Sequence, residues 1–230
     1  MRAFAVLSSN CAGRQALLAE NGLSLYIRYD DVDFLFDTGA GSLFADNAEF
    51  MSLPLHKIEF AAISHKHEDH CGGLPFLSQI FSMISGQCDV FCPVDFEFPP
   101  VPALRQRPIS ENCEIISGIR AVVTESVISE EIVKEVSILA GETLFTGCSH
   151  AGISKILSEA VKSGPVKTIA GGLHNFNESD SEMKKNAQSI ADLGIKKLIV
   201  LHCSSVKSIR SFEDCGIEVK TGCVGNSFNF

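Results

Sequence analysis

Three histidines and one aspartate lie within six consecutive residues, directly after a mostly apolar run at residues 58–63. A strand that ends there delivers the next loop to an edge of its sheet, where imidazole and carboxylate groups can converge on zinc, iron or manganese. His65 and His67 are two residues apart and project to one side of an extended segment, so they are predicted to bind one ion. Asp69 and His70 follow a turn and are predicted to face a second ion. The alternative is a solvated turn, but the chain has only seven histidines, so three in one loop favour a metal site.

The loop reads H-x-H-x-D-H, then Cys71 and G-G-L. This motif resembles the metal-binding loop of the metallo-β-lactamase superfamily. The resemblance implies an α/β fold of the four-layer αββα sandwich type, with a one- or two-metal site at one edge. Gly72 and Gly73 suit a tight turn into a helix, because glycine tolerates backbone angles that other residues do not.

Length and composition predict one globular domain over residues 1–230. Hydrophobic residues make up 45% and charged residues 20%, without a long apolar run, so no membrane association is expected. The apolar start at residues 4–7 is interpreted as a first strand rather than a secretory signal, which predicts a cytoplasmic protein. A net charge of -9 without a basic stripe argues against a nucleic-acid partner. A small-molecule substrate is expected, and the sequence does not determine the oligomeric state.

The nine cysteines are an odd number without a predicted signal peptide, which predicts reduced thiols rather than a disulfide framework. Cys88 and Cys92 have the spacing of a metal pair, but structural burial is the favoured interpretation, since a reduced cysteine behaves as a small hydrophobic residue. Cys71, Cys148 and Cys203 differ, because each lies within two residues of a candidate ligand histidine.

Short strands are predicted at residues 4–7, 23–28 and 34–36, and the third leads into D-T-G-A-G at residues 37–41. The resemblance implies that Asp37 supports the metal loop by hydrogen bonds to its histidines without binding metal. Such a contact fixes the tautomer and orientation of a ligand imidazole. The alternative for Asp37 is a helix cap or turn residue.

The central segment is the least regular part of the sequence. A helix is predicted at residues 74–81, strand-like pieces at 78–84 and 90–92, and antiparallel strands at 115–124 and 132–139. Residues 93–108 contain five of the eight prolines and are predicted to form an irregular loop. This loop, with Phe96 and Phe98, is either a lid over the metal cleft or a packed surface excursion.

A second group of candidate ligands follows the predicted strand T-L-F-T-G at residues 143–147. Cys148 occupies the place where the resemblance implies an aspartate that bridges two metals, and a thiolate there is softer and larger than a carboxylate. The resemblance also implies a ligand histidine in the interval between the H-x-H-x-D-H loop and this strand. No histidine lies between His70 and His150, so His150 is predicted to take its place. The alternative for His150 is a turn residue before the next helix.

The last third alternates helices, predicted at 153–162 and 179–193, with strands, predicted at 166–170, 196–201 and 217–219, as in an α/β fold. His174 and His202 each follow a strand, and the resemblance implies that His202 is the last metal ligand. The phrases G-C-S-H-A-G-I, G-G-L-H and H-C-S-S resemble the dihydropterin-aminobenzene-phosphate synthase-like subgroup of that superfamily.

These patterns predict a metal-dependent hydrolase that acts on a small ester or phosphoester with a metal-activated water. Two divalent ions are expected, zinc first, with iron or manganese as alternatives. One ion is assigned His65, His67 and His150, and the other Asp69, His70 and His202, with Cys148 as a shared ligand. Asp69 and His174 are the predicted catalytic residues, and His174 is an additional ligand, a proton donor or a phosphate contact. The alternatives are an iron-dependent oxidoreductase of the same fold and a non-catalytic metal sensor.

Overall fold

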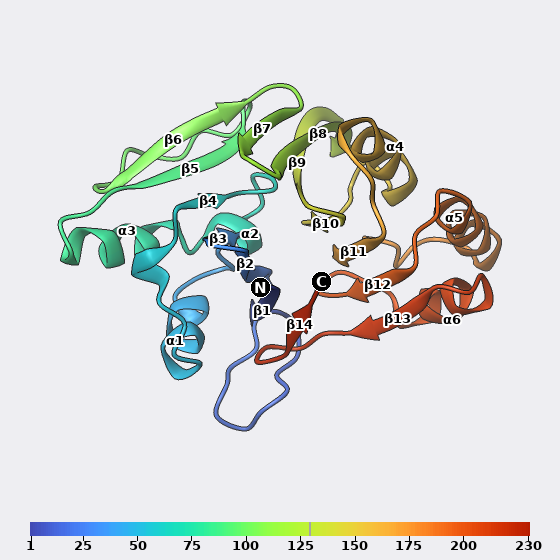
Figure 1. Ribbon diagram of the computed structural model, residues 1–230, viewed down its shortest axis with the longest axis horizontal. Coiled ribbons are helices and arrows are strands. Elements are labelled where there is room, and N and C mark those ends of the chain that lie inside the picture. The colour runs from blue at the N-terminus through green and yellow to red at the C-terminus, as the bar shows by residue number, and fades with distance from the viewer. Residues whose placement is uncertain (129) are drawn as a thin grey trace. The chain divides into compact units, whose positions relative to one another are not determined.

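The structure is a computed structural model that describes residues 1–128 and 130–230. Contacts divide the chain into two compact units, which we describe separately: unit 1 contains residues 1–109 and 222–230, and unit 2 contains residues 110–221. Each unit contains a seven-stranded sheet (Figure 1). None of the helices in the described ranges has the length and apolar character needed to span a membrane.

The sheet of unit 1 has the strand order β14-β1-β2-β3-β4-β5-β6. Its strands are β1 (Arg2–Ser8), β2 (Ser24–Tyr29), β3 (Val32–Phe36), β4 (Phe60–Ala62), β5 (Cys88–Pro93), β6 (Leu104–Ile109) and β14 (Ser227–Asn229). Strands β3 to β6 are parallel, and β14, β1 and β2 add antiparallel pairs. Short apolar runs with aromatic residues suit these buried strands, and the rings of Phe34 and Phe60 stack at 4.8 Å on the neighbouring strands β3 and β4.

Unit 1 also contains helices that cover its hydrophobic core. They are α1 (Leu43–Phe50), the short 3₁₀ helix η1 (Leu55–Lys57), α2 (Glu68–Cys71) and α3 (Leu74–Met83). Helix α3 begins with Pro75 in its first turn, where a missing N–H removes no helical bond. Its buried residues Leu74, Leu77 and Phe81 recur at helical spacing and pack into the core.

The sheet of unit 2 has the strand order β13-β12-β11-β10-β9-β8-β7. Its strands are β7 (Cys113–Ile116), β8 (Ile119–Ile128), β9 (Glu131–Ala140), β10 (Thr143–Thr146), β11 (Thr168–Gly171), β12 (Lys197–Val200) and β13 (Glu218–Thr221). Strands β7 to β10 are antiparallel, whereas β10 to β13 are parallel. The parallel strands end in register, so the loops that follow them lie at one edge of this sheet.

Three longer helices pack beside the parallel part of that sheet: α4 (Ile153–Ser163), α5 (Asp180–Asp192) and α6 (Val206–Asp214) (Figure 1). Helix α4 buries Ile153, Ile156 and Leu157 at helical spacing, which predicts the face it turns to the core. Helix α5 begins with a capping box in which the side chains of Ser179 and Glu182 each accept a backbone N–H of the other residue. These helices confirm the strand and helix alternation predicted for this region.

Two predictions about the central segment are wrong. Residues 78–83 belong to helix α3 rather than to a strand, because Leu77 and Phe81 continue its buried face. Residues 104–109 form strand β6 rather than an irregular loop, because an edge strand tolerates the missing N–H of Pro108. Phe96 is buried in the core of unit 1, with its ring 5.9 Å from that of Phe98, so the structure has the packed surface excursion and not the lid.

One cysteine pair contradicts the prediction that all thiols are reduced, because Cys11 and Cys223 form a disulfide within unit 1. Backbone pairing brings these distant residues together: Val224 N donates to Cys11 O at 2.8 Å, and Gly13 N donates to Val224 O at 2.9 Å. The pairing follows from the return of the chain terminus to the first sheet, which no local sequence pattern indicates. The remaining cysteines lie outside the disulfide.

Candidate metal centre

The metal loop of unit 1 begins where two parallel strands end side by side. Residue Phe36 of β3 lies opposite Ala62 of β4, so Asp37 is adjacent to the first residues of the loop. The backbone N of Asp37 donates to Ala62 O at 2.8 Å, and its φ of +58° is a left-handed conformation that aspartate adopts more readily than most residues. The topology therefore places a buried carboxylate beneath the histidine loop.

Asp37 holds the loop through three hydrogen bonds. Its carboxylate accepts the backbone N–H of Ser64 at 2.7 Å and the Ser64 hydroxyl at 2.8 Å, and it lies 2.6 Å from Nδ1 of His70. All three side chains are fully buried. The predicted contact between Asp37 and a histidine of the loop is confirmed for His70.

Ser64 extends this support to a second histidine, because its Oγ lies 2.8 Å from Nδ1 of His65. The rings of His65 and His70 are 4.2 Å apart, and Nε2 of His65 is 2.9 Å from Nδ1 of His67. Asp69 Oδ2 lies 3.9 Å from Nε2 of His70. The structure thus gathers the four predicted ligands of this loop within unit 1.

This group fits a divalent cation. A ligand histidine needs one ring nitrogen anchored so that the other nitrogen points at the metal. In His65 and His70 the anchored atom is Nδ1, so Nε2 is the nitrogen that would face an ion; in this structure Nε2 of His65 contacts Nδ1 of His67. Imidazole nitrogen and carboxylate oxygen are ligand atoms that suit zinc, iron or manganese.

The predicted site residues of unit 2 follow three adjacent parallel strands. Thr146 of β10, Gly171 of β11 and Val200 of β12 lie at the same level of the sheet. The loops after them carry the four predicted residues of this unit, which are Cys148, His150, His174 and His202. Strand register therefore explains why residues more than fifty positions apart gather at one edge.

Backbone hydrogen bonds fix the loop after β10. Glu135, which is buried on β9, accepts the N–H groups of Cys148 at 3.2 Å and Ser149 at 2.8 Å through Oε1. The Ser149 hydroxyl donates to Gly172 O at 2.7 Å and joins this loop to the one after β11. These bonds satisfy polar groups that burial would otherwise penalise.

The loops after β10, β11 and β12 also carry backbone strain. Ser149, His174 and His202 have φ values of +59°, +46° and +46°, in a region that side chains with a Cβ rarely adopt. Such conformations persist only where surrounding contacts enforce them, and they concentrate at functional sites. The strain at two candidate histidines is therefore an independent sign of function in this edge of unit 2.

His174 lies between a histidine and two cysteines. Its ring is 4.4 Å from that of His150. One of its nitrogens and the sulfurs of Cys148 and Cys203 all lie within 4.8 Å of one another. Both sulfurs are buried, whereas His174 is exposed. The role of Cys148 as a shared metal ligand stays a prediction.

The cysteines beside the candidate ligands differ in acidity. A hydrogen bond with the Cys148 side chain, another with His174 and the charge of His202 hold the pKa of the Cys203 thiol well below its ordinary value, against the effect of burial. In unit 1, burial raises the pKa of the Cys71 thiol to about 12, and the carboxylates of Asp37, Asp69 and Glu68 add to the shift. Cys203 therefore has thiolate character that Cys71 lacks.

Three supporting residues were missed by sequence reasoning. Ser64 directly precedes the histidine motif and was given no role. Gly172 allows close approach of Cys203, since a Cβ there would lie 2.5 Å from its sulfur. Glu135 gave a usable signal, because it is an acid at a position of its strand that alternation with Val133 directs inward. Cys203 was singled out but received no role.

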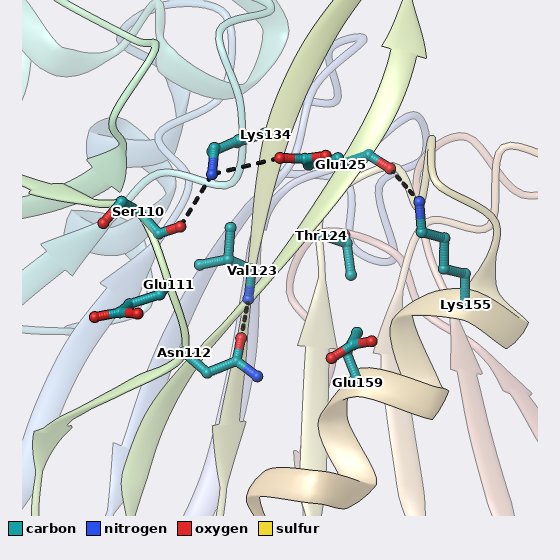
Figure 2. Close-up of a pocket in the computed structure, with 9 residues that line it drawn as sticks. All are labelled: Ser110, Glu111, Asn112, Val123, Thr124, Glu125, Lys134, Lys155 and Glu159. Atoms are coloured by element: carbon teal, nitrogen blue, oxygen red, sulfur yellow. Dashed lines mark hydrogen bonds and ion pairs between the residues drawn. The ribbon is translucent and has the colours of Figure 1, made fainter.

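A groove of about 470 Å³ on unit 2 lies apart from these residues (Figure 2). Its lysines are engaged by the protein itself: Lys134 lies 3.5 Å from the Glu125 carboxylate and 3.0 Å from Ser110 O, and Lys155 donates to Glu125 O at 2.7 Å (Figure 2). The remaining lining adds acidic residues, so the groove has no net positive field for an anionic ligand. None of the predicted ligands lines it.

The architecture defines the class of the protein. Its two seven-stranded mixed sheets with their helices match the α/β sandwich of the metallo-β-lactamase fold, which confirms the predicted fold class. The solved structure of Tm1679, described as a metal-dependent hydrolase of the beta-lactamase superfamily, matches 100% of this chain and 99% of its own with a TM-score of 0.82 and 20% identity. A diphosphatase from the PhnP family (TM-score 0.65, 14% identity, 100% of this chain and 98% of its own) and human tRNase Z, short form (0.64, 15%, 99% and 98%), share the fold.

Sequence comparison finds a match to the same superfamily in part of the chain. Residues 18–109, which include Asp37 and the H-x-H-x-D-H loop, match the model of the metallo-beta-lactamase superfamily. The resemblance to this superfamily that the motif indicated is therefore confirmed.

Two curated proteins of Methanocaldococcus jannaschii are similar in sequence. The uncharacterized protein MJ0448 is 21% identical over 89% of this chain and 91% of its own length. The 7,8-dihydropterin-6-methyl-4-(beta-D-ribofuranosyl)-aminobenzene-5'-phosphate synthase is 27% identical over 52% of this chain and 38% of its own length. The second match is a weak relative from the subgroup that the C-terminal phrases resemble.

Proposed function

We propose that this protein is a metal-dependent hydrolase that acts on a small ester or phosphoester. The observation that carries the proposal is the buried support of the histidine loop, in which Asp37 and Ser64 anchor Nδ1 of His70 and His65. A ligand histidine requires an anchor of this kind for its second ring nitrogen, whereas the histidines of a solvated turn require no buried carboxylate or hydroxyl. The description of Tm1679 as a metal-dependent hydrolase supports the same conclusion.

The proposed centre holds two divalent ions, zinc first, with iron or manganese as alternatives. The ligands proposed for one ion are His65, His67 and His150. The ligands proposed for the other are Asp69, His70 and His202, with Cys148 shared between the ions. When bound, the ions would supply an activated water near neutral pH and would polarise the oxygen under attack.

The residues of the chain have distinct tasks in this proposal. Asp37 and Ser64 orient the imidazoles, so that little rearrangement is needed when a cation binds. Asp69, whose side chain is partly exposed, is a proposed metal ligand and the proposed partner of the attacking water. His174 is exposed and lies beside His150, which suits a group that donates a proton to the leaving oxygen or contacts a phosphate.

The substrate is proposed to be a small molecule, with a phosphorylated one favoured by the diphosphatase that shares the fold. The absence of a nucleic-acid partner stays a prediction, and tRNase Z shows that the fold itself does not exclude one. The cytoplasmic location and the single domain over residues 1–230 also stay predictions.

Elemental analysis of the purified protein followed by a panel of chromogenic substrates tests the proposal. The panel contains a phosphomonoester, a phosphodiester, a carboxylic ester, a thioester and a short RNA. We expect bound divalent metal and hydrolysis of at least one phosphoester. His70→Ala should lose most of the bound metal and the turnover together, whereas His56→Ala, outside the motif, should change neither.

Three outcomes would contradict the proposal. A protein that binds metal and hydrolyses nothing in the panel would instead be the non-catalytic metal sensor. Redox-active iron without ester hydrolysis would favour the oxidoreductase. Full metal content in His70→Ala would show that the loop is not a ligand set.

A further inference from the structure

Unit 2 contains a further group of donor atoms, which shares Cys148 and His174 with the proposed hydrolase centre and adds the sulfur of Cys203. Cys148, His174 and Cys203 follow the adjacent parallel strands β10, β11 and β12. One imidazole nitrogen and the two sulfurs all lie within 4.8 Å of one another. We infer that these three side chains form a cation site within unit 2 that is selective for a thiophilic metal.

The positions of the three ligands are built into the fold. The N–H groups of Cys148 and Ser149 are held by the buried carboxylate of Glu135. The sulfur of Cys203 lies against Gly172, where any Cβ would come within 2.5 Å of it, and points toward Cys148 O at 3.8 Å. His174 is kept at a φ of +46°, a conformation that must be enforced by its surroundings.

The spacing fits a tetrahedral ion. Zinc lies about 2.3 Å from sulfur and about 2.0–2.1 Å from imidazole nitrogen, which separates the ligand atoms of a tetrahedral site by about 3.5–3.8 Å. Atoms already within 4.8 Å of one another need only small side-chain rotations to reach that geometry. The three ligand atoms, from the loops after β10, β11 and β12, are therefore close to the spacing of a tetrahedral site.

The donor chemistry selects the class of metal. Thiolate sulfur is a soft ligand that favours zinc, cadmium and copper(I), whereas magnesium and calcium require oxygen ligands. Two thiolates also balance the charge of a divalent ion at a buried position, which lowers the free energy of holding it there. Because His174 is exposed while both sulfurs are buried, a fourth coordination position would face solvent.

Cobalt(II) and cadmium(II) titrations of the metal-stripped full-length protein test this inference, because sulfur bound to either ion gives a charge-transfer absorption. We expect one ion held by two thiolates. Cys203→Ser should reduce the charge-transfer absorption per ion by about half and weaken cadmium binding by about tenfold or more. His174→Gln should weaken binding by a similar factor and retain the absorption. Cys113→Ser, an exposed cysteine of the same unit, should change neither.

The outcomes separate this site from the proposed hydrolase centre. His70→Ala removes a ligand of that centre and should leave the thiolate absorption intact. Loss of the absorption in His70→Ala, or an unchanged absorption in Cys203→Ser, would overturn the inference without affecting the hydrolase proposal. Peptide mapping that finds a disulfide between Cys148 and Cys203 even after metal is added would overturn the inference as well. Thiolate absorption that depends on Cys203, in a protein that hydrolyses nothing in the panel, would refute the proposed hydrolase function and support this cation site.

Discussion

Replacing Asp37 by asparagine isolates the support of the metal loop from its ligands. Asparagine has nearly the same shape and tolerates the left-handed φ of +58° at this position, so the backbone is expected to stay in place. One amide oxygen can still accept the N–H of Ser64, which the carboxylate accepts at 2.7 Å. The other atom becomes an NH₂ group that faces Nδ1 of His70 as a second donor.

The expected loss follows from the bond that is removed. The contact between Asp37 and His70 is 2.6 Å long, fully buried and made by a charged acceptor, and such bonds contribute about 1.5–3 kcal/mol. If that free energy is needed to hold the imidazole in its metal-binding orientation, zinc affinity falls by about 10- to 100-fold. The proposed hydrolysis should fall with metal occupancy and return partly at high zinc concentration.

Competition with a chromogenic chelator measures the affinity of the wild type and the variant. Asp33→Asn is the matched control, because Asp33 is on strand β3, which leads to Asp37, and pairs with Arg28 and Tyr26 rather than with the loop. Ser64→Ala provides a second variant, which should weaken zinc binding less, since it removes the hydroxyl that joins Asp37 to His65. Wild-type zinc affinity in a folded Asp37→Asn protein would refute the argument that this carboxylate positions a ligand.

Three further predictions concern packing, acidity and covalent structure. Gly172→Ala should destabilise the protein by about 1–3 kcal/mol in denaturant unfolding, because its Cβ would meet the sulfur of Cys203, whereas Gly41→Ala, with open space around it, should stay within about 0.5 kcal/mol; equal effects would contradict this. Burial raises the pKa of the Cys88 thiol from 9.0 to about 12, so stability present below pH 9 is lost as the pH rises toward 12. Cys88→Ala should lessen that decline in the free energy of unfolding by about 1.4 kcal/mol per pH unit. Identical slopes of stability against pH in the wild type and the variant would exclude the raised pKa. Thiol titration of the denatured protein should give seven thiols before reduction and nine after it, and reduction should lower stability by about 2–4 kcal/mol; nine thiols before reduction would exclude the disulfide.

The elements predicted from sequence were those with a strong local period. The strands near Phe4, Phe34 and Phe145 and the helix from Ile153 were found because their apolar residues recur at the spacing of a strand or a helix. Helix α1 was missed and β6 was taken for a loop. In β6 the one proline, Pro108, is tolerated because the strand is at the edge of its sheet, which is a property of the strand order and not of the residues.

The sequence by itself determined which candidate ligand residues the chain carries, because H-x-H-x-D-H is a local pattern of residue types at short spacing. Only the tertiary structure decided which distant groups touch these ligands. Asp37 reaches His70, Glu135 reaches the Cys148 loop, and Cys11 reaches Cys223 through strand pairing and register. Register is fixed by packing along whole strands, so contacts between distant residues cannot be read from either segment alone.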